Sequence, residues 1–201
     1  VIQGFGSDGR VYTVPVSELP GARGDGSPLT SFVNLAAGSQ MVAYYAGQPD
    51  DLVLLSTKAG YGFLANVADM STRNKAGKSF ISIDAKVAGD APLGAAKVEV
   101  GMKQVACLSA ASKLLVFPLD ELKRLPTGGK GVILMGLDDK EFMSSAIAVG
   151  TNGATYSGAG RAGKPTELSL DAKTLKSFAG NRARKGHFVE PRLKDGKLKA
   201  N

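Results

Sequence analysis

Few residues in this chain could catalyse a reaction or hold a metal ion. Its 201 residues include one histidine, His187, and one cysteine, Cys107, so a cluster of such ligands cannot form and a histidine base has a single candidate. Adjacent acids occur at Asp50–Asp51, Asp120–Glu121 and Asp138–Asp139. Because neighbouring residues of a strand point to opposite faces, we interpret them as turn and solubility residues rather than an acid/base pair. The sequence therefore predicts no catalytic, cofactor or metal site.

Two glycine-rich motifs have the composition of nucleotide-binding loops but not their context. Residues 4–9 match the glycine spacing of a dinucleotide-binding turn, which functions only where a strand leads into a helix. The next residues, 10–15, are rich in β-branched and aromatic types and end in proline, so we expect a hairpin turn. Residues 128–131 lack the upstream glycine and the hydroxyl residue of a P-loop. Neither motif predicts a cofactor.

A basic loop with a glycine occurs four times along the chain. The glycines are Gly26, Gly77, Gly131 and Gly186, which are 51, 54 and 55 residues apart. Glycine lets the backbone approach a phosphate, while Arg and Lys supply charge and hydrogen bonds. Four such loops on one rim would suit binding and bending of duplex DNA through its backbone. The predicted DNA contacts are Arg23, Arg73, Lys75, Lys78, Lys123, Arg124, Lys130, Arg182, Arg184 and Lys185.

The net charge of +7 comes from the last part of the chain. Residues 1–160 carry fourteen basic and fourteen acidic side chains, whereas residues 161–201 carry eleven basic and four acidic ones. This asymmetry indicates a polyanionic partner, with nucleic acid first and an acidic membrane surface second. A solvated C-terminal tail is the alternative that charge alone leaves open. No apolar run is long enough to span a membrane. Cys107 is the single cysteine and lies in an apolar stretch, which favours a reducing, cytoplasmic compartment.

The basic loops belong to a longer internal repeat. Residues 9–19, 60–70 and 112–122 share one pattern at steps of 51 and 52 residues, and a weaker copy opens at Gly163. The repeat divides a single domain, 1–201, into units of approximately 1–50, 51–101, 102–142 and 143–201. Short β-prone stretches that end at turn signals indicate about four strands per unit, as in a propeller blade, so we expect an all-β fold. The Gly- and Ala-rich residues 84–101 and 138–162 are expected to be links.

Several of these motifs together resemble one protein family. Residues 9–12 with 19–30, 59–63 with 73–78, and 117–122 with 129–131 are similar to the C-terminal domains of the A subunits of bacterial type IIA topoisomerases. The resemblance implies a β-pinwheel, a propeller-like disc of about four to five four-stranded blades that exchange strands, with duplex DNA bent around a basic rim. It implies that the catalytic tyrosine lies outside this chain and that no cofactor binds here. The implied partners are the rest of the A subunit and an ATPase B subunit. The implied location is the cytoplasm, in association with the nucleoid.

The resemblance favours the topoisomerase IV type over the gyrase type. Gyrase relatives carry a glutamine-arginine-glycine-glycine box for chiral wrapping, and the nearest segments here, 22–26 and 180–186, do not keep it intact. A role in capturing DNA and tuning decatenation and supercoil relaxation is therefore expected, with gyrase-like wrapping as an alternative. A second alternative is a propeller-type platform for protein interaction, with a condensin-type partner. The apolar start at Val1 leads us to expect a piece of a longer protein, in which either a preceding unit has been trimmed or the ring is short.

Overall fold

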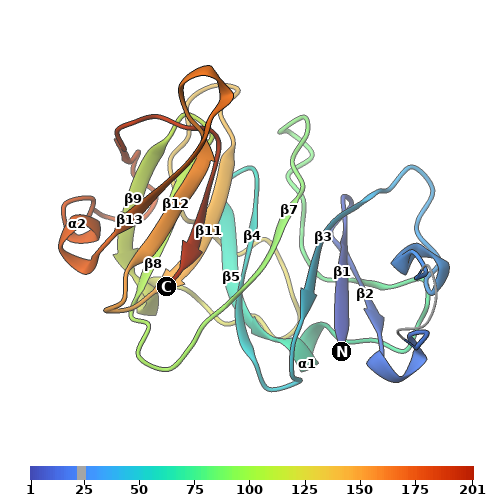
Figure 1. The fold of residues 1–201 in the computed structure, drawn as a ribbon. Helices are drawn as coiled ribbons and strands as arrows, with labels where there is room; N and C mark the ends of the chain where they lie inside the picture. The colour runs from blue at the N-terminus through green and yellow to red at the C-terminus, as the bar shows by residue number, and fades with distance from the viewer. Residues whose placement is uncertain (22–25) are drawn as a thin grey trace.

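The computed structural model describes residues 1–21 and 26–201, so the predicted contact Arg23 lies outside the described residues. Within them the chain is built of short strands and single helical turns (Figure 1). The strands are β1 (Ile2–Gly6), β2 (Arg10–Val14), β3 (Met41–Ala46), β4 (Leu52–Thr57), β5 (Tyr61–Asn66), β6 (Lys78–Ser79), β7 (Pro92–Lys97), β8 (Gln104–Ser109), β9 (Lys113–Pro118), β10 (Val132–Ile133), β11 (Met143–Val149), β12 (Ala154–Ala159), β13 (Pro165–Leu170), β14 (His187–Phe188) and β15 (Lys194–Ala200). The turns are η1 (Val16–Glu18), η2 (Leu29–Ser31), α1 (Val67–Met70), η3 (Leu119–Glu121), η4 (Arg161–Gly163) and α2 (Ala172–Lys176).

Each sheet contains one hairpin of the repeat. The hairpin forms the middle of the three four-stranded sheets, whereas in the three-stranded sheet β12 is the middle strand and β13 an edge strand. The hairpins are β1–β2, β4–β5, β8–β9 and β12–β13. Gly9, Gly60 and Gly163 lie in their turns with φ of 82°, 86° and 74°, and Ser112 takes the same place with φ of 64°. This left-handed conformation favours glycine, which explains the glycines at these turns. Residues 4–9 therefore belong to a hairpin and its turn, as predicted.

The outermost strand of the first three sheets comes from the following repeat unit. β6 pairs with β2, β10 pairs with β5, and β14 pairs with β9. The strand orders are β3-β1-β2-β6, β10-β5-β4-β7, β11-β8-β9-β14 and β13-β12-β15, and the pairings between these strands are antiparallel. Neighbouring units are thus joined by exchanged strands. This topology confirms the predicted all-β pinwheel, with four blades in the described chain.

The core is layered between successive blades because both faces of the hairpin strands are covered. Phe5 on β1 packs in one cluster with Val53 and Leu55 on β4. The residue between these two, Leu54, belongs instead to the cluster shared with Cys107 of the third blade. Alternate side chains of one strand therefore face different neighbouring blades, which is why these strands are continuous apolar runs in the sequence. A third such layer joins the third and fourth blades.

The innermost strands of the blades pack against one another in sequence. β3 contacts β7, β7 contacts β11, and β11 contacts β15. At the first of these contacts a Cβ on Gly94 would lie only 3.0 Å from the Cβ of Ala43, so small residues allow the strands to converge. The first and fourth blades lie at opposite ends of this row (Figure 1).

This arrangement corrects the interpretation of two segments as links. Residues 84–101 contain β7, and residues 138–162 contain β11 and β12. Their small side chains lower β-propensity, but packing at the centre of the pinwheel overrides it. β11 pairs with β8 in the sheet of the third blade.

Candidate nucleic-acid interface

The predicted basic loops lead into the exchanged strands. We call residues 71–77, 123–131 and 177–186 the exchange loops, because β6, β10 and β14 follow them. A Cβ added to Gly77, Gly131 or Gly186 would crowd the carbonyl oxygen of Val11, Gly62 or Leu114, each on the preceding blade. These glycines therefore allow close packing against a neighbouring blade. Gly26, at the equivalent point of the first unit, has no atom within 4 Å of such a Cβ.

The second unit presents two cations without an acidic partner. Arg73 and Lys75 are exposed, and neither makes an ion pair or a side-chain hydrogen bond within the described part of the chain. Together with the hydroxyl residues Ser71 and Thr72 they border a hollow of about 530 Å³. The carboxylate of Glu18 lines the same hollow but makes no ion pair with either cation in the part of the chain that the structure describes.

Lys123 and Arg184 are also exposed and lack a carboxylate partner among the described residues. Their backbones are fixed even so. The carbonyl of Lys123 accepts a hydrogen bond from Leu64 N at 2.9 Å, and that of Arg184 accepts one from Gly136 N at 3.0 Å. All three exchange loops thus hold at least one cation that is free to contact an anion.

Two other predicted contacts converge on Asp69 of α1. Lys78 Nζ donates to the backbone carbonyl of Asp69 at 2.7 Å and lies 5.3 Å from the centre of the Phe80 ring. Arg124 Nη2 lies 3.7 Å from the Asp69 carboxylate. These cations are positioned by the fold and are partly neutralised by it.

Three more predicted contacts are held by polar groups of neighbouring units. Lys130 Nζ donates to Asp84 at 2.8 Å and lies 4.1 Å from the centre of the Tyr61 ring. Arg182 Nη1 donates to the carbonyl of Ile133 at 2.6 Å, and its Nε lies 3.4 Å from Glu121. Lys185 pairs with Asp138.

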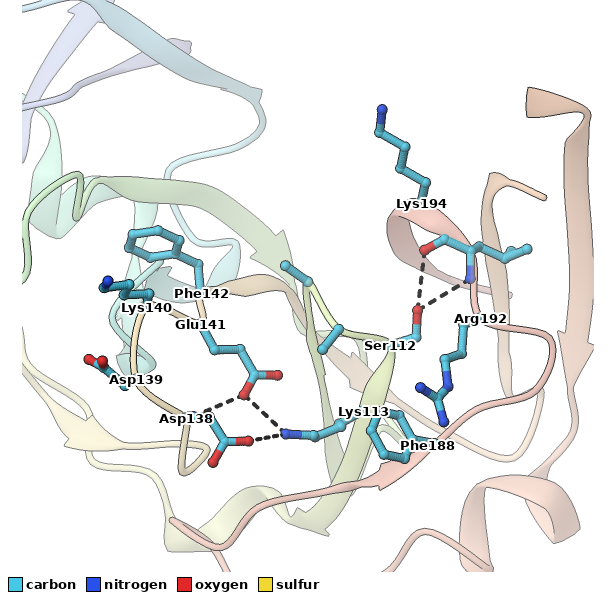
Figure 2. A pocket seen from close by; sticks show the side chains of 13 residues that line it. Ser112, Lys113, Asp138, Asp139, Lys140, Glu141, Phe142, Phe188, Arg192 and Lys194 are labelled. Atoms are coloured by element: carbon cyan, nitrogen blue, oxygen red, sulfur yellow. Dashed lines mark hydrogen bonds and ion pairs between the residues drawn. The ribbon is translucent and has the colours of Figure 1, made fainter. Parts of the chain in front are cut away.

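The pair of Lys185 and Asp138 belongs to a larger ionic group at the third blade. Figure 2 shows the carboxylates of Asp138 and Glu141 converging on the ammonium group of Lys113. Lys113, followed by Lys185, lowers the pKa of Asp138 to about 2. Lys113, Asp138 and Glu141 line a hollow of about 660 Å³. In this hollow the guanidinium carbon of Arg192 lies 3.7 Å from the centre of the Phe188 ring.

Comparison with known proteins identifies the family of this chain. The sequence model described as "DNA gyrase C-terminal domain, beta-propeller" matches residues 5–38, 51–89 and 103–149. These segments cover more than half of the chain. The chain belongs to the DNA gyrase C-terminal domain family.

Relatives of this gyrase-type domain include the A subunits of two topoisomerases. The A subunit of DNA topoisomerase 4 from Neisseria gonorrhoeae is 32% identical over 179 residues, which are 88% of this chain and 23% of the relative. The equivalent protein of Pseudomonas aeruginosa is 33% identical over 186 residues, 90% of this chain and 24% of the relative. The chain therefore spans about a quarter of their length. The predicted resemblance to topoisomerase IV A subunits is confirmed.

Solved structures share the fold of this gyrase-type domain. The E. coli ParC C-terminal domain superposes with a TM-score of 0.80 at 23% identity, over 98% of this chain and 80% of that one. A DNA gyrase A C-terminal domain gives 0.71 at 18% identity, over 92% and 58%. At these identities the matches support the pinwheel fold.

Residues 1–21 and 26–201 of the gyrase-type domain were searched for membrane-spanning helices and for groups of metal ligands. None of its helices there is long and apolar enough to cross a bilayer, and no three His, Cys, Asp or Glu side chains are grouped to hold a metal. Cys107 is fully buried, and burial raises the pKa of its thiol, so it is a core residue as predicted. His187 is exposed on β14.

Sequence reasoning missed the acids that hold the basic loops of this gyrase-type domain. Asp138 and Glu121 were interpreted as turn and solubility residues, but they pair with Lys185 and Arg182. Asp69 and Asp84 were not singled out. A signal was present, because Asp84 and Asp138 are separated by 54 residues and Lys130 and Lys185 by 55.

Proposed function

We propose that this domain binds duplex DNA through the phosphate backbone along its exchange loops and bends the bound segment. It does so as an accessory to a topoisomerase IV-type A subunit, tuning decatenation and supercoil relaxation. In this proposal the catalytic tyrosine lies elsewhere in the longer protein, the ATPase B subunit is a partner of the assembly, and the domain acts at the nucleoid in the cytoplasm.

The observation that carries the proposal is the set of exposed cations without an acidic partner on three consecutive exchange loops. Arg73 and Lys75, Lys123, and Arg184 represent the second, third and fourth units. Cations that repeat with the blades contact successive phosphates without reading bases, and such contacts make affinity strongly dependent on salt. The cations that already have intramolecular partners are proposed as secondary contacts: Lys78, Arg124, Lys130, Arg182 and Lys185.

A protein-docking role is the second candidate. Val42 and Tyr44 on β3 are 40% and 58% exposed, on a face that no further blade covers in the described chain. Exposed apolar side chains of this kind are typical of protein contacts. A docking platform would bind DNA weakly or not at all.

The test is the affinity for a duplex of about 30 base pairs, roughly three helical turns, measured by fluorescence anisotropy as salt is varied. For the variant Arg73→Ala/Lys75→Ala we expect weaker binding and a log–log salt slope that is shallower by about 1.8, or about 0.9 for each lost phosphate contact. Lys103→Ala/Lys199→Ala removes the same charge from two exposed lysines that lie outside the exchange loops and make no ion pair with the described residues, and is the matched control.

Equal slopes for the two variants would show that the loop cations make no specific phosphate contacts. Absent or salt-insensitive binding by the unaltered domain would favour the docking platform instead. A duplex labelled at both ends reports bending by energy transfer, and we expect the ends to approach only when the domain is bound.

A further inference from the structure

Each exchange loop is joined to the preceding unit by one recurring backbone hydrogen bond. In each case the acceptor is the carbonyl two residues before the anchoring glycine. Asn34 N donates to Lys75 O at 2.7 Å, Ser82 N to Gly129 O at 2.9 Å, and Gly136 N to Arg184 O at 3.0 Å. We call these three bonds the loop joints. Their acceptors occupy equivalent positions in successive units, and the donors follow an anchoring glycine by five residues at Ser82 and Gly136 and by eight at Asn34.

The side chains at the loop joints differ in a systematic way. The residue before the glycine is Ala76 in the first joint, Lys130 in the second and Lys185 in the third. Two residues after the donor amide, the first joint has Ala36, whereas the other two have Asp84 and Asp138. Lysine and acid are thus both present or both absent. Where they are present, they form an ion pair.

These pairs are within reach of an external anion. The side chains of Lys130 and Lys185 are 42% and 60% exposed. Exposed ion pairs contribute little net stability, so a phosphate can compete for the same ammonium group. Asp84 is also held by the backbone N–H of Lys86, and Asp138 by Lys113, so each carboxylate would stay beside the incoming phosphate and repel it.

We infer that Asp84 and Asp138 compete with DNA phosphates for Lys130 and Lys185, and so limit the number of phosphate contacts at the second and third loop joints. The first joint, with Arg73 and Lys75 unpaired, binds without this competition. The inference rests on the proposed DNA binding and assigns the two acids as residues that set its strength.

Asp84→Asn and Asp138→Asn test this inference, because asparagine keeps the shape and one acceptor oxygen of each side chain. We expect each variant to bind the duplex roughly two- to fivefold more tightly at about 0.15 M salt, the range expected for an exposed ion pair, and to steepen the log–log salt slope by about 0.9. Asp139→Asn is the matched control, because Asp139 is exposed, adjacent to Asp138, and makes no ion pair with the described residues. We expect its slope to equal that of the unaltered domain.

A second comparison separates competition from a general effect of charge. As a single substitution, Lys130→Ala should change the salt slope far less than Lys75→Ala does. In the double variant Asp84→Asn/Lys130→Ala, the tighter binding and steeper slope expected of Asp84→Asn should disappear. The inference is overturned if Asp84→Asn matches Asp139→Asn, or if it binds more weakly with a shallower slope, which would mean that the acids position the lysines for phosphate. If the unaltered domain does not bind DNA, the proposed function itself fails.

Discussion

The exchange of strands between blades predicts that two glycines with the same φ differ strongly in how much their substitution by alanine destabilises the fold. Gly131 and Gly38 both have φ of 76°, but a Cβ at Gly131 would lie well within 3.0 Å of Gly62 O, whereas one at Gly38 would meet no atom within 4 Å. Gly131→Ala and Gly38→Ala therefore share the cost of a left-handed alanine, roughly 1–2 kcal/mol. Only Gly131→Ala adds a collision with the neighbouring blade.

The additional cost follows from the contacts next to Gly131. Non-bonded atoms settle at about 3.5 Å, so the loop would have to retreat by about 1 Å or more. That movement disrupts the bond from Leu134 N to Gly60 O, at 2.7 Å, and the pairing of β10 with β5. Two or three lost hydrogen bonds at about 0.5–1.5 kcal/mol each give an excess of about 1–4.5 kcal/mol.

Urea unfolding of the two variants measures this difference directly. We expect the free energy of unfolding of Gly131→Ala to fall below that of Gly38→Ala by at least about 1 kcal/mol. Hydrogen exchange at the Leu134 amide should also accelerate in Gly131→Ala alone. If the two variants unfold within about 0.5 kcal/mol of each other, the close crossing of the exchanged strand over β5 is refuted.

Two further predictions concern the third and fourth blades. Tyr156 is fully buried, and its hydroxyl donates to Ser112 Oγ at 2.8 Å and accepts from Leu193 N at 2.9 Å; Tyr156→Phe should lower the free energy of unfolding by about 1–3 kcal/mol, and no change in a urea titration would contradict this network. The pKa of Asp138 is about 2, below the ordinary value, so its pairing stabilises the fold at neutral pH and is lost as the pH falls from about 4 towards 2. The acid-induced loss of stability, followed by circular dichroism, should therefore be smaller in Asp138→Asn, and identical acid transitions would contradict the pairing.

The repeat allowed much of the pinwheel to be predicted from the sequence. Strands such as β4 and β8 are apolar on both faces because each lies between two blades, and this gave a strong local signal. The inner strand β7 gave no such signal, because Gly94 and the alanines beside it have low β-propensity. These small residues allow close packing at the centre of the pinwheel. Local propensity could not reveal a contact with β3, which is distant in the sequence.

The basic loops could be located from the sequence, but the ion pairs of their cations could not. The glycines located the exchange loops, although their role against Val11, Gly62 and Leu114 depends on the neighbouring blade. Whether a cation is free depends on acids about 50 residues away, such as Asp84 beside Lys130. Counting charges within each loop therefore overstated the number of unpaired cations.

The most direct test of DNA binding along the exchange loops is cleavage of bound duplex by an iron chelate attached to the domain. Cys107 is fully buried, so the chelate can be directed to Lys75→Cys, Arg184→Cys or, as the control, Lys103→Cys. We expect cleavage of the DNA backbone from positions 75 and 184, at sites separated along the duplex, and none from position 103. Cleavage from position 103 without cleavage from 75 or 184 would contradict the account.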